Sequence, residues 1–231
     1  MDKWKHLRKN LFLTVEPEVK LVAITQPYGE YKELCTTETL PAFTARASHE
    51  SKGTKEDDIR LNKTLIKLDH DTPLQAVEYV FHVSGITKSL QAQWTRHKIG
   101  VGWTFRSTRY VPASQNYFVY NTYNYINDEE KVRELLKIDE AIAKKAIELF
   151  EKRITLGATK QDARKIMPVF WTTSCYFYVN ARALRHLFKL RLTKAAEWEI
   201  RRMVSIMFDI CMQFTPSLFE DLKELRDKTE F

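Results

Sequence analysis

Alternation of apolar and polar residues marks the clearest strand of the chain. From Val77 to Val83 every second residue is Val, Tyr or Phe, which is the period of a strand with one buried face. Gly85 follows shortly and is expected to end the strand. Segment 19–24 is a short apolar run, and segment 169–179 is dense in aromatic, Thr and Val residues. Both are therefore predicted to be strands as well.

Helical periodicity, with apolar residues three or four positions apart, marks most of the remaining segments. The strongest helix is predicted over 127–152, where an acidic first turn suits the positive end of the helix dipole. The polar stretch 50–58 contains a glycine and is predicted to be a surface loop. Shorter helices are predicted over 59–68, over 86–98, between Thr159 and Pro168, over 181–192 with Asn180 as N-cap, and from Thr193 as N-cap to about Phe214.

The order of these elements indicates the fold class. Strands and helices are interspersed without a regular strand–helix–strand repeat, which favours an α+β domain over a doubly wound sheet. A length of 231 residues suits one domain or two tightly joined ones. The composition, 44% hydrophobic with only 6 Gly and 7 Pro, is unlike that of disordered chains. We therefore expect one compact domain over residues 1–231.

Charge and cysteine usage narrow the possible partners and location. Lys and Arg exceed Asp and Glu by 37 to 30, a formal net charge of +7 that favours polyanions such as nucleotides, polyglutamylated cofactors or nucleic acid. Cys35, Cys175 and Cys211 show no paired spacing and are expected to be free thiols. No stretch approaches the roughly 18 apolar residues of a membrane span, so we expect a soluble cytoplasmic protein with no membrane partner.

Cationic and amide side chains gather in two nearby segments, 93–98 and 107–110. On the predicted helix, Gln93, Arg96 and His97 share one polar face. Arginine donates bidentate hydrogen bonds to phosphate, and an imidazole or phenol ring can stack on a planar heterocycle. A solvated basic helix face is an equally good interpretation of these residues alone. The common dinucleotide, P-loop, hydrolase and zinc-protease motifs are absent, and we expect no metal site.

The two segments resemble the signature of the flavin-dependent thymidylate synthases. Arg96-His97-Lys98 resembles the family's Arg-His-Arg triplet, and Ser107 with Arg109-Tyr110 resembles the serine and Arg-Tyr pair that follow it. Several matches in the right order are far more specific than any one of them. Further matches are Thr44-Ala45-Arg46-Ala47-Ser48, His70-Asp71-Thr72-Pro73, Ala163-Arg164 with Pro168, Asn180-Ala181-Arg182-Ala183-Leu184, Leu190-Arg191-Leu192 and Trp198-Glu199-Ile200.

The resemblance implies a role for each matched residue. It assigns Arg191 to the pyrimidine ring, as the catalytic residue that stabilises the anion from which C5 attacks. His70 and Tyr110 would border the flavin face on which folate stacks. Nucleotide binding would fall to Gln93, Ser107, Arg109 and Arg164. FAD binding would fall to Ser48, Thr72, Arg96, His97, Lys98, Asn180, Arg182 and His186. Without the family, Asn180 is equally an N-cap, His70 a turn-capping residue and Arg164 a surface charge.

The resemblance also implies the reaction and the assembly. The expected enzyme is a methyltransferase-type thymidylate synthase that converts dUMP to dTMP, with methylenetetrahydrofolate as carbon donor and FAD reduced by NADPH. It would need no cysteine nucleophile. The family's fold is a central, mostly antiparallel sheet flanked by long helices. Its flavin sites draw residues from different subunits of a homotetramer, and no nucleic acid partner is expected.

Departures from the family pattern leave alternatives open. Lys98 replaces the second arginine, Gln75 and Ala195 stand where Glu and His are common, and the loop 99–106 is one residue longer than usual. Because polar sites discriminate by pairing each hydrogen-bonding group, these changes bear on substrate choice. The alternatives are a flavin-dependent methylase of UMP or another pyrimidine nucleotide, and a non-catalytic flavin-binding relative. A basic protein that binds single-stranded nucleic acid is an alternative of a different class.

Overall fold

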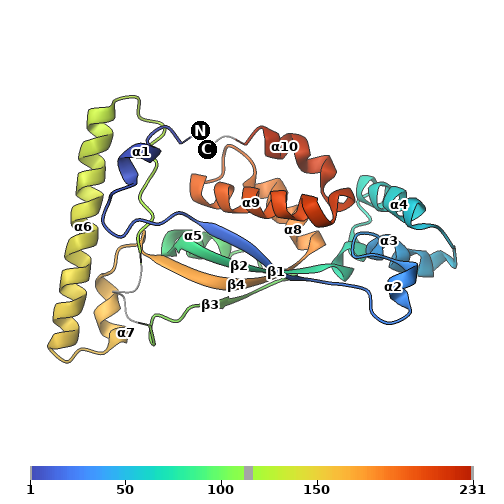
Figure 1. The fold of residues 1–231 in the computed structure, drawn as a ribbon, viewed down its shortest axis with the longest axis horizontal. Coiled ribbons are helices and arrows are strands. Elements are labelled where there is room, and N and C mark those ends of the chain that lie inside the picture. The colour runs from blue at the N-terminus through green and yellow to red at the C-terminus, as the bar shows by residue number, and fades with distance from the viewer. Residues whose placement is uncertain (1, 112–116, 230–231) are drawn as a thin grey trace.

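A four-stranded antiparallel sheet lies at the centre of the molecule (Figure 1). The structure is a computed structural model and describes residues 2–111 and 117–229. In this part of the chain the strand order is β1-β2-β4-β3, and every neighbouring pair is antiparallel. The predicted α+β fold with an antiparallel sheet is confirmed. The strands are β1 (Glu18–Ile24), β2 (Glu78–Thr87), β3 (Val101–Phe105) and β4 (Thr172–Asn180).

Strand β2 continues past the glycine that was expected to end it. Gly85 has a φ of +66°, in the left-handed region that favours glycine, and the pairing with β4 shifts between Val83 and Ile86. A side chain at Gly85 would also meet the carbonyl oxygen of Glu16 at 2.5 Å. Gly85 therefore bends the strand and admits a neighbouring segment, so the prediction of a strand end was wrong.

Strand β3 was not predicted, because its five residues lie inside the basic signature region. Its alternation is nevertheless clear in the structure. Val101, Trp103 and Phe105 pack against the core, while Thr104 on the other face is exposed. Trp103 pairs with Phe177 of β4, with the ring centroids 5.7 Å apart. A five-residue strand with two polar or small residues gives too few repeats to be recognised from sequence.

Each of the six predicted helices corresponds to a helix of the structure, whereas α1, α2, α3 and α10 were not predicted. Asn180 caps α8, as predicted, and Thr159 caps α7; each accepts a hydrogen bond from the backbone N–H three residues on. In the described residues the helices are α1 (Lys5–Arg8), α2 (Tyr31–Leu34), α3 (Leu40–Ala45), α4 (Lys55–Lys67), α5 (Lys88–Trp94), α6 (Glu129–Thr155), α7 (Lys160–Ala163), α8 (Ala181–Arg191), α9 (Trp198–Phe214) and α10 (Lys223–Asp227).

Three predicted helix boundaries are wrong. Helix α4 begins at Lys55, inside the segment 50–58 that was predicted to be a loop, because Thr54 and Asp57 form a capping box there. The helix predicted over 86–98 is the shorter α5, because Thr87 ends β2 and caps the helix through the backbone N–H of Leu90. Arg96 and His97 lie beyond its end, so they do not share a helical face with Gln93. The helix predicted to start at Thr193 begins only after Glu197, whose carboxylate accepts from the first backbone N–H groups of α9.

Helices cover one face of the sheet and both of its ends. Figure 1 shows α8, α9 and α10 above the sheet, α2 to α4 at one end, and the long α6 with α7 at the other. The main core lies between β2, β4, α8 and α9. On the opposite face of the sheet the side chains of Tyr176 and Tyr178 are 45% and 43% exposed.

A second apolar cluster packs beneath α6. Trp4, Phe118, Tyr120 and Ile147 are among its buried residues, and they join the N-terminal segment to α6 and to the chain that precedes it. The described residues form a single domain with two apolar clusters. The sequence also predicted that residues 1–231 form a single domain of the family that the chain resembles, and this stays a prediction.

Glu199, at the start of α9, ties this helix to the junction between β2 and α5. Its side chain is 3% exposed and accepts hydrogen bonds from the backbone N–H of Thr87 at 2.7 Å and from the Thr87 hydroxyl at 2.6 Å. Burial raises the pKa of Glu199 to about 7, and the two bonds from Thr87 only partly offset this effect. The position of α5, and of the basic segment that follows it, thus depends on a buried carboxyl group.

We expect the unfolding free energy of the protein to fall as the pH rises from about 4.5 to about 7. Because the folded Glu199 holds its proton at a higher pH than the unfolded one, its contribution is lost in this window, by about 3 kcal/mol in total. Glu199→Gln should remove most of that dependence while keeping the bond from Thr87 N–H. Chemical denaturation at pH 5 and pH 8 measures this pH dependence of the unfolding free energy. Glu151→Gln, at an exposed position, is the control. Equal pH slopes in wild type and Glu199→Gln would contradict the assignment.

Candidate functional site

Ser48, His70 and Thr72 line one open cavity of about 620 Å³. Ser48 lies just after α3, while His70 and Thr72 lie in the segment that follows α4. The structure therefore brings together two residues predicted to bind FAD and one predicted to lie beside folate. Apolar residues of α4 form part of the wall, so the cavity offers a planar ligand both polar and apolar contacts.

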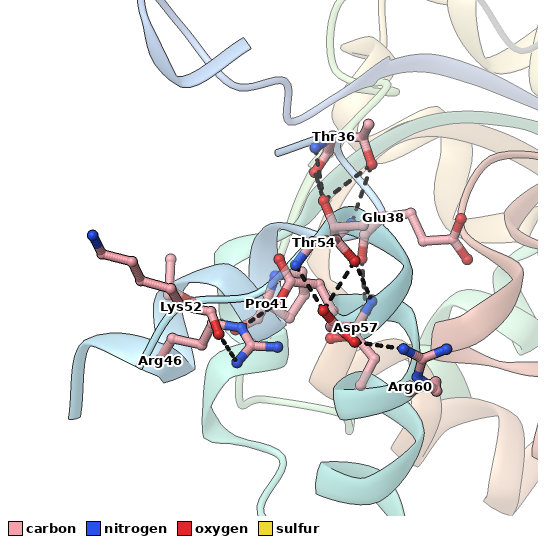
Figure 2. Close-up of polar contacts among 12 residues, drawn as sticks. Thr36, Glu38, Pro41, Arg46, Lys52, Thr54, Asp57 and Arg60 are labelled. Carbon is pink, nitrogen blue, oxygen red and sulfur yellow. Dashed lines mark hydrogen bonds and ion pairs between the residues drawn. The ribbon is translucent and has the colours of Figure 1, made fainter. Parts of the chain in front are cut away.

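Arg46, from the same motif as Ser48, lines the same cavity and is also bonded within the fold. Its Nε bonds to the buried Asp58 carboxylate at 2.5 Å, and its Nη1 donates to the carbonyl oxygen of Lys52 at 3.1 Å (Figure 2). A side chain at Gly53 would overlap the Arg46 guanidinium, with the nearest atom at 2.3 Å. Arg46 thus fixes the loop between α3 and α4 on which Ser48 depends.

Asp71 connects this cavity to helix α8. Its Oδ1 lies 3.0 Å from Nε of Arg182, and both side chains line a second cavity of about 370 Å³. Asn180 and His186 line the same cavity. Asp71 stands between His70 and Thr72 in sequence, so consecutive residues of one segment line the first and the second cavity. The ion pair between Asp71 and Arg182 therefore joins the His-Asp-Thr-Pro segment to α8.

Asn180 and Gly100 shape the floor of the second cavity. The Asn180 side chain caps α8 by accepting from the N–H of Ala183 at 2.9 Å, and its backbone N–H donates to the carbonyl oxygen of Gly100 at 3.1 Å. Gly100 has a φ of +68°, and a side chain there would meet the Asn180 amide nitrogen at 2.6 Å. Asn180 is thus an N-cap and a cavity residue at once, so both interpretations of it hold.

A third cavity, of about 400 Å³, lies on the next face of α8. His97, His186 and Arg191 meet there: Nε of Arg191 donates to Nε2 of His97 at 3.2 Å, and the two imidazole centroids are 6.3 Å apart. Arg96 and Lys98 line the same cavity. Helix geometry predicts that Arg182 and Arg191, nine positions apart, point in opposite directions. They line different cavities, and His186 lines both.

The electrostatics of the third cavity keep His97 neutral. Burial lowers the pKa of His97 below its usual range, and the charges of Arg191 and His186 lower it further. Because Nε2 accepts a hydrogen bond from Arg191, the ring proton lies on Nδ1. Neutral His97 therefore orients the guanidinium of Arg191 without placing a second positive charge next to it. The two terminal nitrogens of Arg191 make no hydrogen bond within residues 2–111 and 117–229.

Three residues predicted to bind the nucleotide, Ser107, Arg109 and Arg164, lie beyond the far end of β3. Nη1 of Arg164 donates to the hydroxyl of Thr108, and the hydroxyl of Ser107 accepts from the backbone N–H of Arg109 at 3.4 Å. The guanidinium carbon of Arg109 lies 5.9 Å from the ring centroid of Tyr110, which is 74% exposed. Hydroxyl and guanidinium donors are thus available together, as a phosphate site requires.

Lys88 adds positive charge to this end of the sheet. Burial lowers the pKa of Lys88, and the charge of Arg164 lowers it further. The Lys88 ammonium also lies 6.0 Å from the ring centroid of Trp171. Two partly desolvated cations in one place favour an anionic ligand.

Strand β3 separates these residues from the α8 cavities. The strand runs from Val101, which lines the third cavity, to Phe105, just before Ser107. Five residues of extended chain span about 16 Å. One copy of the chain therefore presents the predicted phosphate ligands and Arg191 in two distinct places.

Comparison with known proteins decides the family. A family model described as "Thymidylate synthase complementing protein" matches residues 32–217, which is most of the chain and includes nearly every element described above. The chain belongs to this family. The resemblance predicted from the sequence is confirmed.

Several relatives carry the name "Flavin-dependent thymidylate synthase". The one from Thermosipho africanus is 30% identical over 192 residues, which cover 76% of this chain and 82% of the relative. The one from Halobacterium salinarum is 27% identical over 201 residues, 78% of this chain and 81% of the relative. A third, from Nitratidesulfovibrio vulgaris, is 30% identical over 159 residues, which cover 68% of this chain and 64% of the relative.

Within the thymidylate synthase complementing protein family, the residues of this chain fit a flavin. The cavities along α8 are lined by guanidinium, imidazole, amide and ammonium groups, and Gly100 lets the backbone approach where a side chain would intrude. Such donors suit a pyrophosphate and a heterocycle with carbonyl oxygens. The group would be held by Arg96, His97, Lys98, Asn180, Arg182 and His186, with Ser48 and Thr72 in the first cavity.

Three features of the site were missed or misplaced by the sequence analysis. Asp71 was not assigned a role, although it lies within a quoted motif, and only the structure shows its bond to Arg182. Gly100 was noted only as part of a lengthened loop. Gln93 was placed on a face with Arg96 and His97, but its side-chain oxygen is buried and has no hydrogen-bond partner in the part of the chain that is described.

The cysteines are buried thiols, and we predict that they are dispensable for turnover. Burial raises the pKa of Cys175 to about 12 and the pKa of Cys211 well above its usual value, so neither forms a thiolate at neutral pH. Cys35, Cys175 and Cys211 changed together to alanine should keep the specific activity per bound flavin. A folded, flavin-loaded triple variant without turnover would refute this prediction.

Proposed function

We propose that the chain is a flavin-dependent thymidylate synthase that converts dUMP to dTMP. By family resemblance, methylenetetrahydrofolate donates the carbon and NADPH reduces FAD. The observation that carries the proposal is the arrangement along α8, where His97, His186 and Arg191 form one cavity and Arg182 with Asp71 forms the next. It occurs in a chain of the matching family.

The enzyme class predicted from the sequence agrees with the names of the relatives. Those names describe a thymidylate synthase of the methyltransferase type. They do not favour methylation of UMP, a non-catalytic flavin protein or a single-stranded nucleic-acid-binding protein. FAD as the particular flavin, NADPH and methylenetetrahydrofolate remain parts of the proposal.

The flavin, when bound, supplies the hydride that completes the methyl group. The chain's own residues would bind and orient the nucleotide. Arg191 is a cationic guanidinium, and its terminal nitrogens are available to the oxygens of a pyrimidine ring. There they would stabilise the negative charge that develops when C5 attacks carbon. Neutral His97 keeps the guanidinium in place.

We propose that the active form is a homotetramer. The separation of Ser107, Arg109 and Arg164 from Arg191 by the length of β3 supports it, because a nucleotide that spans both groups needs them from different copies. A cytoplasmic location also remains a prediction. Among the described residues, no helix is both long and apolar enough to cross a membrane.

An anaerobic titration tests the proposed function. Purified protein should be yellow, with close to one FAD per chain. After reduction, methylenetetrahydrofolate with dUMP should reoxidise the flavin and release dTMP, whereas UMP and dCMP should react much more slowly. A colourless protein that cannot be reconstituted with FAD, or faster oxidation with UMP than with dUMP, would contradict the proposal.

A further inference from the structure

A basic cavity lies next to the flavin-side cavities, between α4, α8 and the turn before α10. Its volume is about 640 Å³. Four cations line it, as two pairs at helical spacing: Lys63 and Lys67 on α4, and Arg185 and Lys189 on α8. Arg185 and Lys189 also line the cavity of Asn180 and Arg182. The basic cavity therefore adjoins the proposed flavin site through a shared wall.

The two carboxylates of this cavity are already paired. Both terminal nitrogens of Arg185 bond to the Asp221 carboxylate at 2.7 Å, and Nη1 also donates to the carbonyl oxygen of Leu218. Nζ of Lys63 lies 2.7 Å from the Glu220 carboxylate. Arg185 and Lys63 are thus neutralised by Asp221 and Glu220. The positive charge that remains in the cavity comes from Lys67 and Lys189.

Lys67 and Lys189 are the unmatched cations. Both are exposed, and neither side chain makes a hydrogen bond or ion pair within residues 2–111 and 117–229. Each stands four positions from another cation on its own helix, where like charges repel rather than stabilise the helix. Two lysines facing one cavity without an acidic partner create a positive potential that attracts an anion.

The walls of the cavity are rigid. Arg185 is 4% exposed and held by Asp221. Helix α4 is fixed at its first turn by the Thr54–Asp57 capping box shown in Figure 2. Farther along, Nδ2 of the fully buried Asn62 donates to the carbonyl oxygen of Glu38 at 2.8 Å. The cations are thus presented by a fixed framework, and a ligand need not order the backbone to bind.

We propose that this basic cavity binds an anionic tail of a ligand whose main part lies in the adjoining flavin-side site. The inference rests on the proposed function. The free cations are lysines, which act as point charges and suit separate carboxylates or a phosphate, whereas the planar fork of Arg185 is occupied by Asp221. Two co-substrates of the proposed reaction can carry such a tail: an oligoglutamylated folate, and a nicotinamide dinucleotide with a 2′-phosphate.

Charge reversal at Lys67 tests the proposal, because Lys67 lines only the basic cavity. In Lys67→Glu, kcat/KM for tetraglutamyl methylenetetrahydrofolate should fall on the order of 10-fold, while kcat/KM for the monoglutamyl form stays unchanged. Lys152→Glu is the matched control, since Lys152 is an exposed lysine in the last turn of α6, as Lys67 is in the last turn of α4. The loss should shrink at high salt.

The second arm identifies the source of the tail. If the NADPH-over-NADH preference falls in Lys67→Glu and the glutamate dependence does not, the tail is the 2′-phosphate, and the anion site is still supported. If neither ratio changes while the protein is flavin-loaded and turns over monoglutamyl folate, the proposal is overturned and the proposed function stands.

Direct binding separates this proposal from the proposed function. Calorimetric titration of the flavin-loaded protein with a tetraglutamate peptide and with inorganic tripolyphosphate should show binding that is weakened in Lys67→Glu and in Lys189→Gln but not in Lys152→Glu. This measurement needs no turnover. Failure of both probes to bind wild-type protein would refute the anion site even if the synthase reaction proceeds.

Discussion

Replacing Arg191 by alanine is expected to lower nucleotide-dependent turnover on the order of 100-fold or more while FAD stays bound. The reason is that the guanidinium acts on charge that develops in the transition state, so its loss affects kcat more than binding. In the structure Arg191 contacts His97 rather than Arg182, so its removal leaves the bond between Arg182 and Asp71 intact. Flavin content by absorbance and single-turnover dTMP formation measure the two effects separately.

Arg191→Lys provides the matched comparison. Lysine keeps the positive charge but lacks the planar fork, so it cannot donate to His97 and to a pyrimidine oxygen with the same geometry. We expect it to restore little activity. If Arg191→Ala released FAD but bound dUMP normally, or if turnover were unchanged, the assignment of Arg191 to the nucleotide would be wrong.

Replacing Arg182 by alanine is expected to weaken retention of FAD by 10-fold or more, since loss of a charge-assisted hydrogen bond costs about 1.5–3 kcal/mol. Arg182 is half-exposed and lies in the cavity lined by Asn180 and His186. The variant should purify with substoichiometric flavin and regain part of its activity when FAD is added in excess. Arg133→Ala on the exposed face of α6 is the control.

Asp71→Asn distinguishes ligand binding from local structure at Arg182. Asparagine removes the charge that pairs with Arg182 but can still accept a hydrogen bond from it. If Arg182 binds flavin directly, Asp71→Asn should weaken FAD binding much less than Arg182→Ala. Equal losses in the two variants would mean that the ion pair itself, by holding the segment of His70 and Thr72, is the critical feature.

Local patterns predicted the elements of this fold better than their limits. The alternation in β2 and the cap at Asn180 are set by neighbouring residues, so they could be predicted. Other boundaries depend on tertiary contacts. Strand β2 continues past Gly85 because Ile86 and Thr87 pair with β4. Helix α5 begins late because Thr87 ends β2 and then caps the helix.

The site was predictable as a set of residues but not as an arrangement. Helix geometry alone placed Arg182 and Arg191 on opposite faces of α8, and they do line different cavities. The bond between Asp71 and Arg182 joins segments more than a hundred residues apart, and no pattern along the chain reports it. Nor could motif order show that Ser107 and Arg191 lie at opposite ends of β3.

The division of the site by β3 has a genetic consequence. An Arg164→Ala chain lacks one half of the proposed nucleotide site and an Arg191→Ala chain lacks the other half. If each complete site takes one half from each of two copies, subunits of the two inactive variants assembled together at random leave roughly a quarter of the sites intact. Two loss-of-function alleles from opposite ends of the strand should therefore complement each other in one cell, whereas two alleles from the same end should not.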